Sequence, residues 1–245
     1  MLLAPLPRLA ALAVSVVLTG CSALPDKPTR ATVYDFGPGA VATQPANREA
    51  LLPALPTLPT LALDEVQSSA ALDSTALLYR LAYADAQALR PYAQARWSMT
   101  PAQLLRQRLR EHLGLRRAVL NSGEGSASMT SGAGSATAPT AAIAGSVGAP
   151  GIGPATTSAT PAILLRIELE EFSQLFESPS ASTGLLRLRA TTVQPSPQGE
   201  KLLGQRSFIV QRPAPSADAA GGVRALTAAT DAVVQEIDQW LQQLR

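Results

Sequence analysis

Residues 163–170 read Ile-Leu-Leu-Arg-Ile-Glu-Leu-Glu, and this stretch decides the fold class. Apolar residues at 163, 165, 167 and 169 alternate with charged residues at 166, 168 and 170. A period of two predicts a β-strand with one buried face and one solvated face. Residues 186–189 and 202–211 have strand-like patterns as well. The short connections at 178–182 and 195–199 are typical of hairpins, so these segments together predict an antiparallel meander.

Two helices are predicted. Thr100, Pro101 and Gln103 have the spacing of a capping box with proline at the first helical position, and Gly114 ends an apolar stripe at 105, 109 and 113. The second helix has an apolar stripe at spacings of three and four: Val223, Leu226, Thr230, Val233, Ile237, Trp240 and Leu244. Its polar face carries Asp231, Gln235, Asp238, Gln239 and Gln242. The stripe suits packing on the sheet or pairing with a partner helix, and an uncovered meander favours packing.

Shorter strands are predicted at 61–66, 77–83, 90–97 and 116–120, with a turn at 85–87 and Pro91 near a strand start or on an edge. Residues 122–161 consist almost wholly of Gly, Ala, Ser, Thr and Pro, a composition that predicts a disordered loop. The predicted fold class is therefore α+β. A single layer of mostly antiparallel sheet is covered by two helices and interrupted by one long Gly/Ala/Ser/Pro loop.

The N-terminus carries a lipobox. Leu18, Thr19 and Gly20 precede Cys21, the only cysteine of the chain, and follow a short apolar run. This pattern predicts cleavage before Cys21 and a lipid on its thiol, namely a diacylglycerol together with an acyl chain such as palmitate. The alternatives are an ordinary secretory signal with a chance cysteine, or a buried core helix. Ser22 rather than Asp follows the cysteine, which favours sorting to the inner leaflet of the outer membrane.

The predicted organisation follows from these segments. Residues 1–20 are a lipoprotein signal peptide and residues 21–30 a tether. Residues 31–245 are one periplasmic domain, interrupted by the flexible loop at 122–161. A lipidated Cys21 leaves no thiol for a disulfide, so the hydrophobic core must hold this domain.

The sequence contains few residues that could form a catalytic or metal-binding site. A net charge of +2 offers no basic excess for nucleic acid. One histidine, His112, and one cysteine exclude His/Cys metal clusters, so we expect no metal and no cofactor besides the covalent lipid. A serine hydrolase triad would need His112, which is predicted to be a solvated helix residue beside Glu111. Glu168 and Glu170, near Glu171, could imitate a pair of catalytic carboxylates. We favour instead a solvated sheet face on which they pair with Arg187 and Arg189 across the strands.

Two further clusters could serve an interface. The first is basic and surrounds the first helix: Arg106, Arg108, Arg110, Arg116 and Arg117. We expect a solvated face there, although such a cluster could also contact anionic lipid head groups or an acidic partner. The second is aromatic and lies in one predicted hairpin: Tyr79, Tyr83, Tyr92 and Trp97. Aromatic residues of this kind serve either a core or a docking surface.

The order of several segments is familiar. They are Tyr34-Asp35-Phe36-Gly37, Leu78-Tyr79-Arg80, the run from Arg96 to Pro101, the run from Leu165 to Phe172, and Ile237-Asp238-Gln239-Trp240-Leu241. This order, after a lipobox, resembles the ABC-type transport auxiliary lipoproteins related to paraquat-inducible protein C.

The resemblance implies a non-enzymatic protein. It would dock a protein with a mammalian-cell-entry (MCE) domain at the outer membrane and, through it, an ABC permease and ATPase that move phospholipid or other hydrophobic molecules. Tyr79, Arg80, Arg96 and Trp97 match recurrent positions and are candidates for docking or for packing. The alternatives are a structural or assembly lipoprotein that partners an outer-membrane barrel and, more remotely, a lipid-anchored hydrolase that uses His112. The sequence leaves open whether the protein forms a homo-oligomer.

Overall fold

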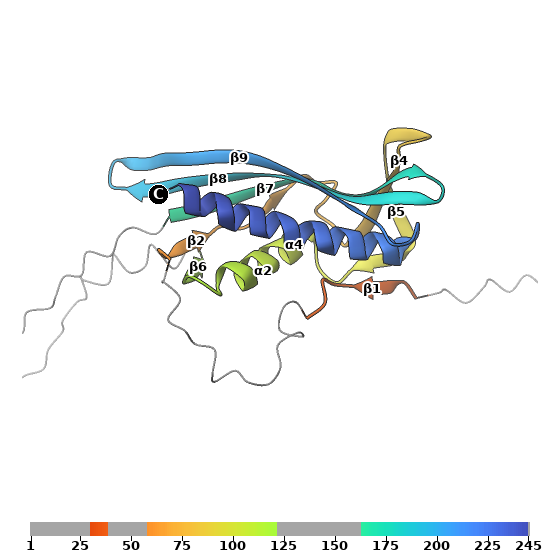
Figure 1. Cartoon of the computed structure of the whole chain (residues 1–245), viewed down its shortest axis with the longest axis horizontal. Helices are drawn as coiled ribbons and strands as arrows, with labels where there is room; N and C mark the ends of the chain where they lie inside the picture. The colour runs from red at the N-terminus through yellow and green to blue at the C-terminus, as the bar shows by residue number, and fades with distance from the viewer. Residues whose placement is uncertain (1–29, 39–57, 122–162, 245) are drawn as a thin grey trace, which may run out of the picture. The chain divides into compact units, whose positions relative to one another are not determined.

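Three long strands form the largest part of the sheet (Figure 1). β7 (Ile163–Ser178), β8 (Ala181–Ser196) and β9 (Gly199–Pro213) run antiparallel in chain order. They are the predicted meander, and each is longer than its clearest run of alternation. The computed structural model describes residues 30–38, 58–121 and 163–244. The described residues from Thr32 onward belong to one compact unit.

Several predictions concern other residues. The signal peptide at 1–20, the lipobox at Leu18, Thr19, Gly20 and Cys21, and nearly all of the tether lie outside the described residues. The Gly/Ala/Ser/Pro loop at 122–161 does so too.

Short strands extend the sheet beyond β7. On the side of β7 away from β8 lie β2 (Leu61–Leu63), β3 (Gln67–Ser68) and β4 (Ala76–Leu81), all parallel to β7. β6 (Val119–Asn121) pairs parallel with β2, β5 (Asp85–Trp97) pairs antiparallel with β4, and β1 (Thr32–Tyr34) pairs parallel with β5. The parallel pairings are short and the antiparallel ones long. The mostly antiparallel α+β class is thereby confirmed, and β9 and β1 lie at opposite edges of the sheet.

The turn predicted at 85–87 was placed too late. The turn lies at 82–84, where the Ala84 amide donates to the Leu81 carbonyl, and β5 already pairs with β4 at Asp85. The Asp85 carboxylate accepts from the amides of Gln87 and Ala88, bonds that aspartate also makes in turns. Pro91 lies beyond the reach of β1, which pairs only with residues 95–97 of β5. The missing N–H of Pro91 therefore removes no bond to β1.

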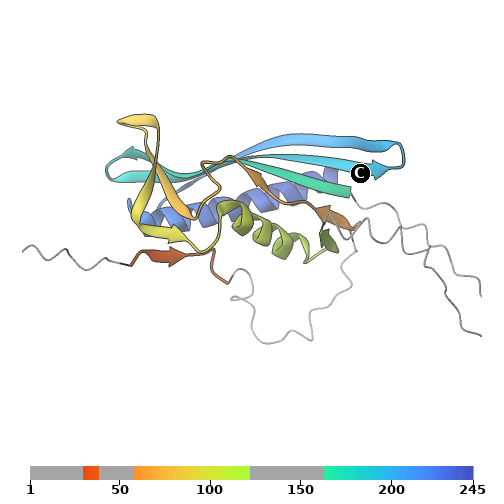
Figure 2. The ribbon, with the colours of Figure 1, turned by 180° about the vertical axis from the view of Figure 1, so that it is seen from behind.

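Two helices cover one side of the β7–β9 strands (Figures 1 and 2). α2 (Pro101–Leu113) begins with the predicted capping box between Thr100 and Gln103 and ends at Gly114. Its stripe of Leu105, Leu109 and Leu113 is buried. α4 (Ala219–Gln243) begins at Asp218, which caps the Gly221 amide. Among the described residues, neither helix has the length and apolarity needed to cross a bilayer.

The core lies between these helices and the strands. β7 and β8 contribute the alternating set Leu165, Ile167, Leu169, Phe172, Leu186, Leu188 and Ala190. α4 contributes Leu226, Ala229, Val233, Ile237 and Trp240, so its stripe packs on the sheet as predicted. The backbone of α4 closely approaches the sheet at Gly184 of β8, where a Cβ would lie 2.7 Å from backbone atoms of Ala225 and Leu226. A side chain at position 184 would hold α4 away from the sheet.

We predict that Gly184→Ala destabilises the protein by about 1–3 kcal/mol because the added methyl overpacks this contact. Replacing a strand glycine in open space would instead be neutral or stabilising, so the sign of the change tests the contact. Thermal unfolding followed by circular dichroism measures it, with Thr183→Ala on the opposite face of β8 as the control. An unchanged or raised melting temperature for Gly184→Ala would contradict the close packing of α4.

A second prediction concerns the cap of α4. Hydrogen bonds from the Gly221 amide and then from the Ser216 hydroxyl lower the pKa of Asp218 below its ordinary value. The charged cap therefore stabilises the fold above the unfolded pKa of aspartate, and this contribution is lost as the pH falls through the lowered folded pKa. Asp218→Asn should be less stable than the wild type at pH 7, and the gap should close on acidification. Urea unfolding at pH 7 and pH 3 measures both, and a gap independent of pH would contradict the charged cap.

Candidate functional site

The four hairpin residues proposed for docking do not form one surface. Trp97 is 1 % exposed. Its ring centroid lies 5.6 Å from those of both Phe36 and Phe172. The side chain of Trp97 therefore belongs to the core.

Tyr79 also packs within the fold. Its ring lies 4.7 Å from that of Tyr92 and 5.9 Å from that of Phe176. The Tyr92 hydroxyl donates to Oε1 of Gln174 at 2.8 Å, and Gln174 is buried. Burial of the phenol, followed by the nearby Tyr79, raises the pKa of Tyr92 to about 12. Tyr92 therefore stays protonated as a hydrogen-bond donor at neutral pH.

Arg80 and Arg96 differ in their surroundings. Arg80 makes two bonds to the Glu171 carboxylate, at 3.0 and 3.3 Å, and donates to the carbonyls of Ala86 and Gln87. It thus ties the β4–β5 hairpin to β7. Arg96 is exposed beside its register partner Val33 on β1. Of the four residues, Arg96 is the one whose side chain is open to a partner. The exposed Tyr83 lies at the hairpin tip, which rises on the side of the sheet away from the helices (Figures 1 and 2).

The carboxylates of β7 pair with arginines across the strands, as predicted. Glu170 contacts Arg187 at 3.0 Å and Arg189 at 2.9 Å, and Glu168 lies 4.0 Å from Arg189. A β-bulge between Leu169 and Glu171 gives Glu170 access to both arginines. The ladder continues to Arg166, which binds Glu200 through two bonds of 2.7 Å. That contact lowers the pKa of Glu200 below its ordinary value. This part of the sheet is therefore a set of ion pairs in which Glu168, Glu170 and Glu200 each have a cationic neighbour.

The expectation of a solvated basic face around α2 was wrong for two of its arginines. Arg108 is 8 % exposed, and the Arg117 side chain is similarly buried. Arg117 and the half-buried Arg116 contact the Asp238 carboxylate at 2.7 and 3.4 Å. Arg106 and Arg110 both bind the amide oxygen of Asn121. Asp238, expected on the polar face of α4, is itself buried. The cluster joins α2 and β6 to the rest of the fold rather than presenting charge to a lipid surface.

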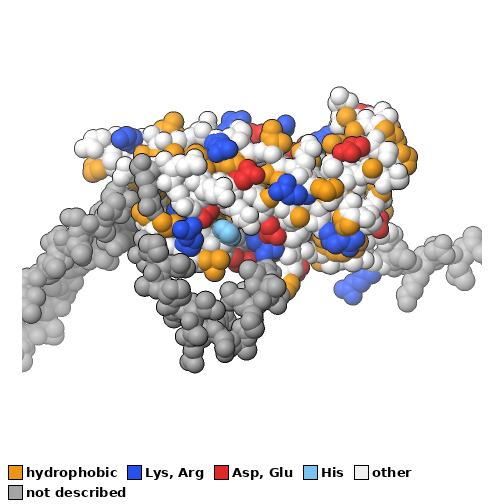
Figure 3. Space-filling model, viewed as in Figure 1, with side chains coloured by type: hydrophobic (Ala, Val, Ile, Leu, Met, Phe, Trp, Pro, Cys, Tyr) orange, Lys and Arg blue, Asp and Glu red, His pale blue; other side chains and the backbone are white. Residues whose placement is uncertain are grey.

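His112 lies half-buried in the last turn of α2. Figure 3 shows the histidine side chain at the surface, with acidic and basic side chains near it. In residues 30–38, 58–121 and 163–244, no group of His, Cys, Asp and Glu side chains is arranged to hold a metal ion.

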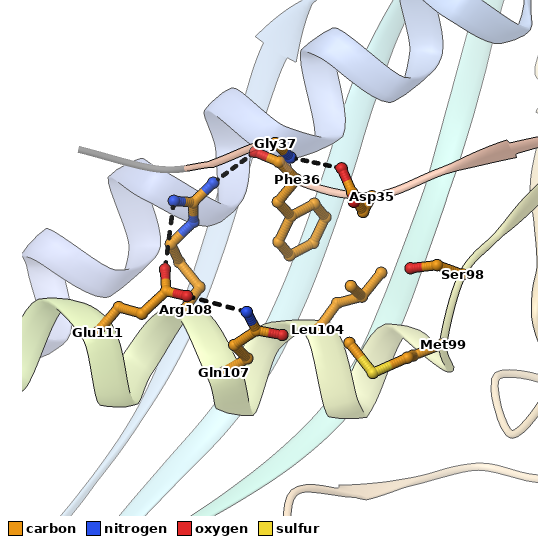
Figure 4. A pocket seen from close by; sticks show the side chains of 9 residues that line it. All are labelled: Asp35, Phe36, Gly37, Ser98, Met99, Leu104, Gln107, Arg108 and Glu111. Atoms are coloured by element: carbon orange, nitrogen blue, oxygen red, sulfur yellow. Dashed lines mark hydrogen bonds and ion pairs between the residues drawn. The ribbon is translucent and has the colours of Figure 1, made fainter. Parts of the chain in front are cut away.

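The sequence analysis quoted Asp35-Phe36-Gly37 only as part of a segment that carries the family resemblance and gave it no structural role. This segment follows β1 and lies between α2 and α4 (Figure 4). The Phe36 ring packs against the rings of Trp97 and Phe172 in the strands, while residues 35–37 line hollows against α2 and against α4, so we call Phe36 the wedge between the helices. Gly37 turns the chain with a φ of 68°, and its amide donates to the Asp35 carboxylate at 2.8 Å. A positive φ strains residues that have a side chain, so glycine suits this turn.

Arg108 holds the wedge in place. Its Nη2 donates to the Phe36 carbonyl at 2.7 Å, and its guanidinium carbon lies 5.8 Å from the centre of the Phe36 ring. Oε2 of Glu111, on α2, lies 3.5 Å from Nη1 of the same guanidinium. Oδ1 of Asp231, on α4, lies 3.1 Å from its Nε, although this contact lacks the alignment of a hydrogen bond. One buried cation therefore links the entering chain to both helices.

Two hollows flank the wedge. The smaller, of about 80 Å³, lies toward α2 and is lined by Leu104, Met99 and Arg108 (Figure 4). The larger, of about 330 Å³, lies toward α4 and is lined by Val223, Thr227 and Asp231. Both have mixed polar and apolar walls. Sequence periodicity carries no signal for this arrangement, because the wedge meets α4 about 190 residues later in the chain.

Comparison with known proteins supports the fold. No protein-family model and no curated protein matches the chain. The crystal structure of protein XCC0632 from Xanthomonas campestris, described with the family DUF330, superposes with a TM-score of 0.54 at 18 % identity, over 78 % of this chain and 89 % of that one. An uncharacterized protein superposes with a TM-score of 0.51 at 12 % identity, over 87 % and 99 %. Neither description states a function, and at these identities the likeness establishes the fold alone.

We predict that the buried ion pairs around Asp238 stabilise the fold. Asp238→Asn removes the carboxylate nearest to the buried Arg117, and breaking a buried pair from one side costs about 3–5 kcal/mol. We expect a loss of that order in urea unfolding. Glu168→Gln is the control, since the Glu168 side chain is largely exposed and its pair should contribute at most about 1 kcal/mol. Equal effects of the two substitutions would contradict the structural role of Asp238.

Proposed function

We propose that the protein is an outer-membrane-anchored periplasmic lipoprotein that docks an MCE-domain protein and, through it, an ABC permease and ATPase for phospholipid or other hydrophobic molecules. One observation carries the docking role. The chain enters the sheet at β1, on one edge, while β9 on the opposite edge pairs with β8 alone among the described residues, so its outer side carries no strand there. An adaptor needs this arrangement, because the anchor and the partner then occupy different edges.

The entry point is suited to an anchor. β1 begins at Thr32, eleven residues after Cys21, and pairs with β5. The Ser98 amide donates to the Tyr34 carbonyl at 2.7 Å, and the next residues form the wedge held by Arg108. A load on the tether would pass through β1 and Phe36 into both helices, so the domain would stay folded while tethered.

The identity of the partners rests on the family resemblance. The quoted segments resemble auxiliary lipoproteins that work with an MCE protein and an ABC transporter. In this proposal the chain supplies attachment and orientation, and the partners supply the energy for transport.

The anchor is tested by Cys21→Ser. This variant should leave the membrane fraction and appear in the soluble periplasmic fraction, because it cannot carry the lipid that holds the protein at the outer membrane. Fractionation followed by immunoblotting measures the shift, with Ser22→Ala as the matched control that keeps the thiol. If Cys21→Ser still sediments with the outer membrane, the anchor proposal fails.

The partner is tested by crosslinking in intact cells. A photoreactive amino acid placed at Tyr83, Leu115 or Ile209, each at least half exposed, probes three separate surfaces. We expect at least one position to crosslink to an MCE-domain protein. The buried Leu105 serves as the negative control. Crosslinks to an outer-membrane barrel alone would favour the assembly alternative, and the absence of any specific protein would contradict docking.

A further inference from the structure

β9 is an edge strand with free backbone groups. It has 15 residues and pairs only with β8 in the described part of the chain. The Ala214 amide donates to the Ser182 carbonyl, which fixes the register as a hydrogen-bonded pair at 182 and 214. Hydrogen-bonded and non-bonded pairs alternate along antiparallel strands. The residues whose N–H and C=O groups point away from β8 are therefore Gln205, Ser207, Ile209 and Gln211. Pro213, which has no N–H, occupies the next such position.

Packing against α4 fixes the position of this edge. Phe208 and Val210 of β9 are buried under α4, and the Phe208 ring lies 5.9 Å from that of Trp240. From Gly204 to Pro213 the pairing with β8 continues without a bulge. An edge that is already ordered loses little conformational entropy when another strand joins it. Its outward N–H and C=O groups can therefore pair with a further strand at little cost in entropy.

The side chains along the edge are basic, with one apolar residue between them. Arg206 and Arg212 share the face of Phe208 and Val210, and neither makes an ion pair within the described residues. Arg206 lies 4.9 Å from the Phe208 ring centre, and Arg212 donates to its neighbour's carbonyl at Gln211. Ile209 is 63 % exposed on the opposite face. The edge therefore presents a cation, then an apolar side chain three residues later on the other face, then a second cation three residues further.

We propose that β9 accepts an added strand from the docked partner, an extended segment with carboxylate residues at two positions six apart and an apolar residue midway. In antiparallel register, the apolar residue sits opposite Ile209 and the carboxylates sit opposite Arg206 and Arg212. The pairs at 206 and 212 are of the same register type as each other. This proposal rests on the docking function above and names the surface that performs it.

A second copy of the chain fits this edge less well. If two β9 strands joined antiparallel with their Ile209 residues opposite each other, Arg206 of each copy would face Arg212 of the other. Like charges directly opposite each other destabilise a strand pair. The charge pattern thus favours an acidic partner strand.

The test uses the full chain in detergent and two labelled seven-residue peptides of identical composition. The first carries Asp at positions 1 and 7 and Ile at position 4, and the second has the Asp residues at positions 2 and 6, on the same face as Ile. Fluorescence anisotropy should show about tenfold tighter binding of the first peptide, because only its carboxylates reach Arg206 and Arg212. Hydrogen exchange of the Ser207 and Ile209 amides should slow when that peptide binds.

A charge swap supplies the matched variant. The double substitution Arg206→Glu and Arg212→Glu should weaken binding of the Asp peptide about tenfold and restore it for a peptide with Lys at positions 1 and 7. Arg96→Glu, on β5 near the opposite edge of the sheet, should change neither affinity. Circular dichroism should show that both variants remain folded, and if the double variant does not, Arg212→Gln alone replaces it with a proportionally smaller loss.

Three results would overturn the proposal. Equal affinity for the two peptides would mean that the arginines only guard the edge against aggregation. Protection of the same amides by self-association, without peptide, would identify a second copy as the occupant. If Tyr83 or Leu115 crosslinks to the MCE protein in cells while neither peptide binds, the surface is wrong and the docking function stands. If no position crosslinks in cells, the docking function itself fails.

Discussion

The packing of α4 on the β7–β9 meander is the constraint on which the rest of the structure depends. It buries the alternate side chains of three strands, and it brings helix backbone against Gly184, where no side chain would fit. Because α4 covers one face, the other face of β7 and β8 can carry paired charges in water. α4 also places Asp231 and Asp238 where the arginines of α2 and the segment after it can reach them. The second helix is thus attached to the first by buried ion pairs as well as by apolar contact.

Arg108 extends this attachment to the N-terminal edge. Its guanidinium binds the Phe36 carbonyl and lies between carboxylates of both helices, so the wedge, α2 and α4 depend on one cation. A tether joined to a loosely held strand would unfold the domain under load, whereas the proposed tether would join β1, which is followed by the buried Phe36. The opposite edge, β9, keeps its outward backbone groups unused by the described residues. In the adaptor role that we propose, the anchor is attached at the β1 edge of the sheet and the partner binds at the β9 edge.

Local patterns predicted the meander, both helices, the caps of the first helix, and the pairing of Glu168 and Glu170 with Arg187 and Arg189. These features depend on periods of two and 3.6 and on neighbours joined by short hairpins. The sequence did not predict contacts between residues that lie far apart in the chain. Asp238 was assigned to the polar face because helical periodicity cannot reveal that Arg116 and Arg117 approach that face. The wedge and the parallel pairing of β2, β3 and β4 with β7 were missed for the same reason. The docking residues proposed from the resemblance were divided by the fold, since Trp97 lies in the core and Arg96 on the surface.

The proposed adaptor role depends most on the lipid at Cys21, because without it neither edge of the sheet would be fixed to the membrane. Mass spectrometry of the intact protein, purified from outer membranes, tests this most directly. We expect a chain that begins at Cys21 and is heavier than its amino-acid sequence by a diacylglycerol and one further acyl chain. A chain that retains residues 1–20, or one that begins at Cys21 with an unmodified thiol, would contradict it.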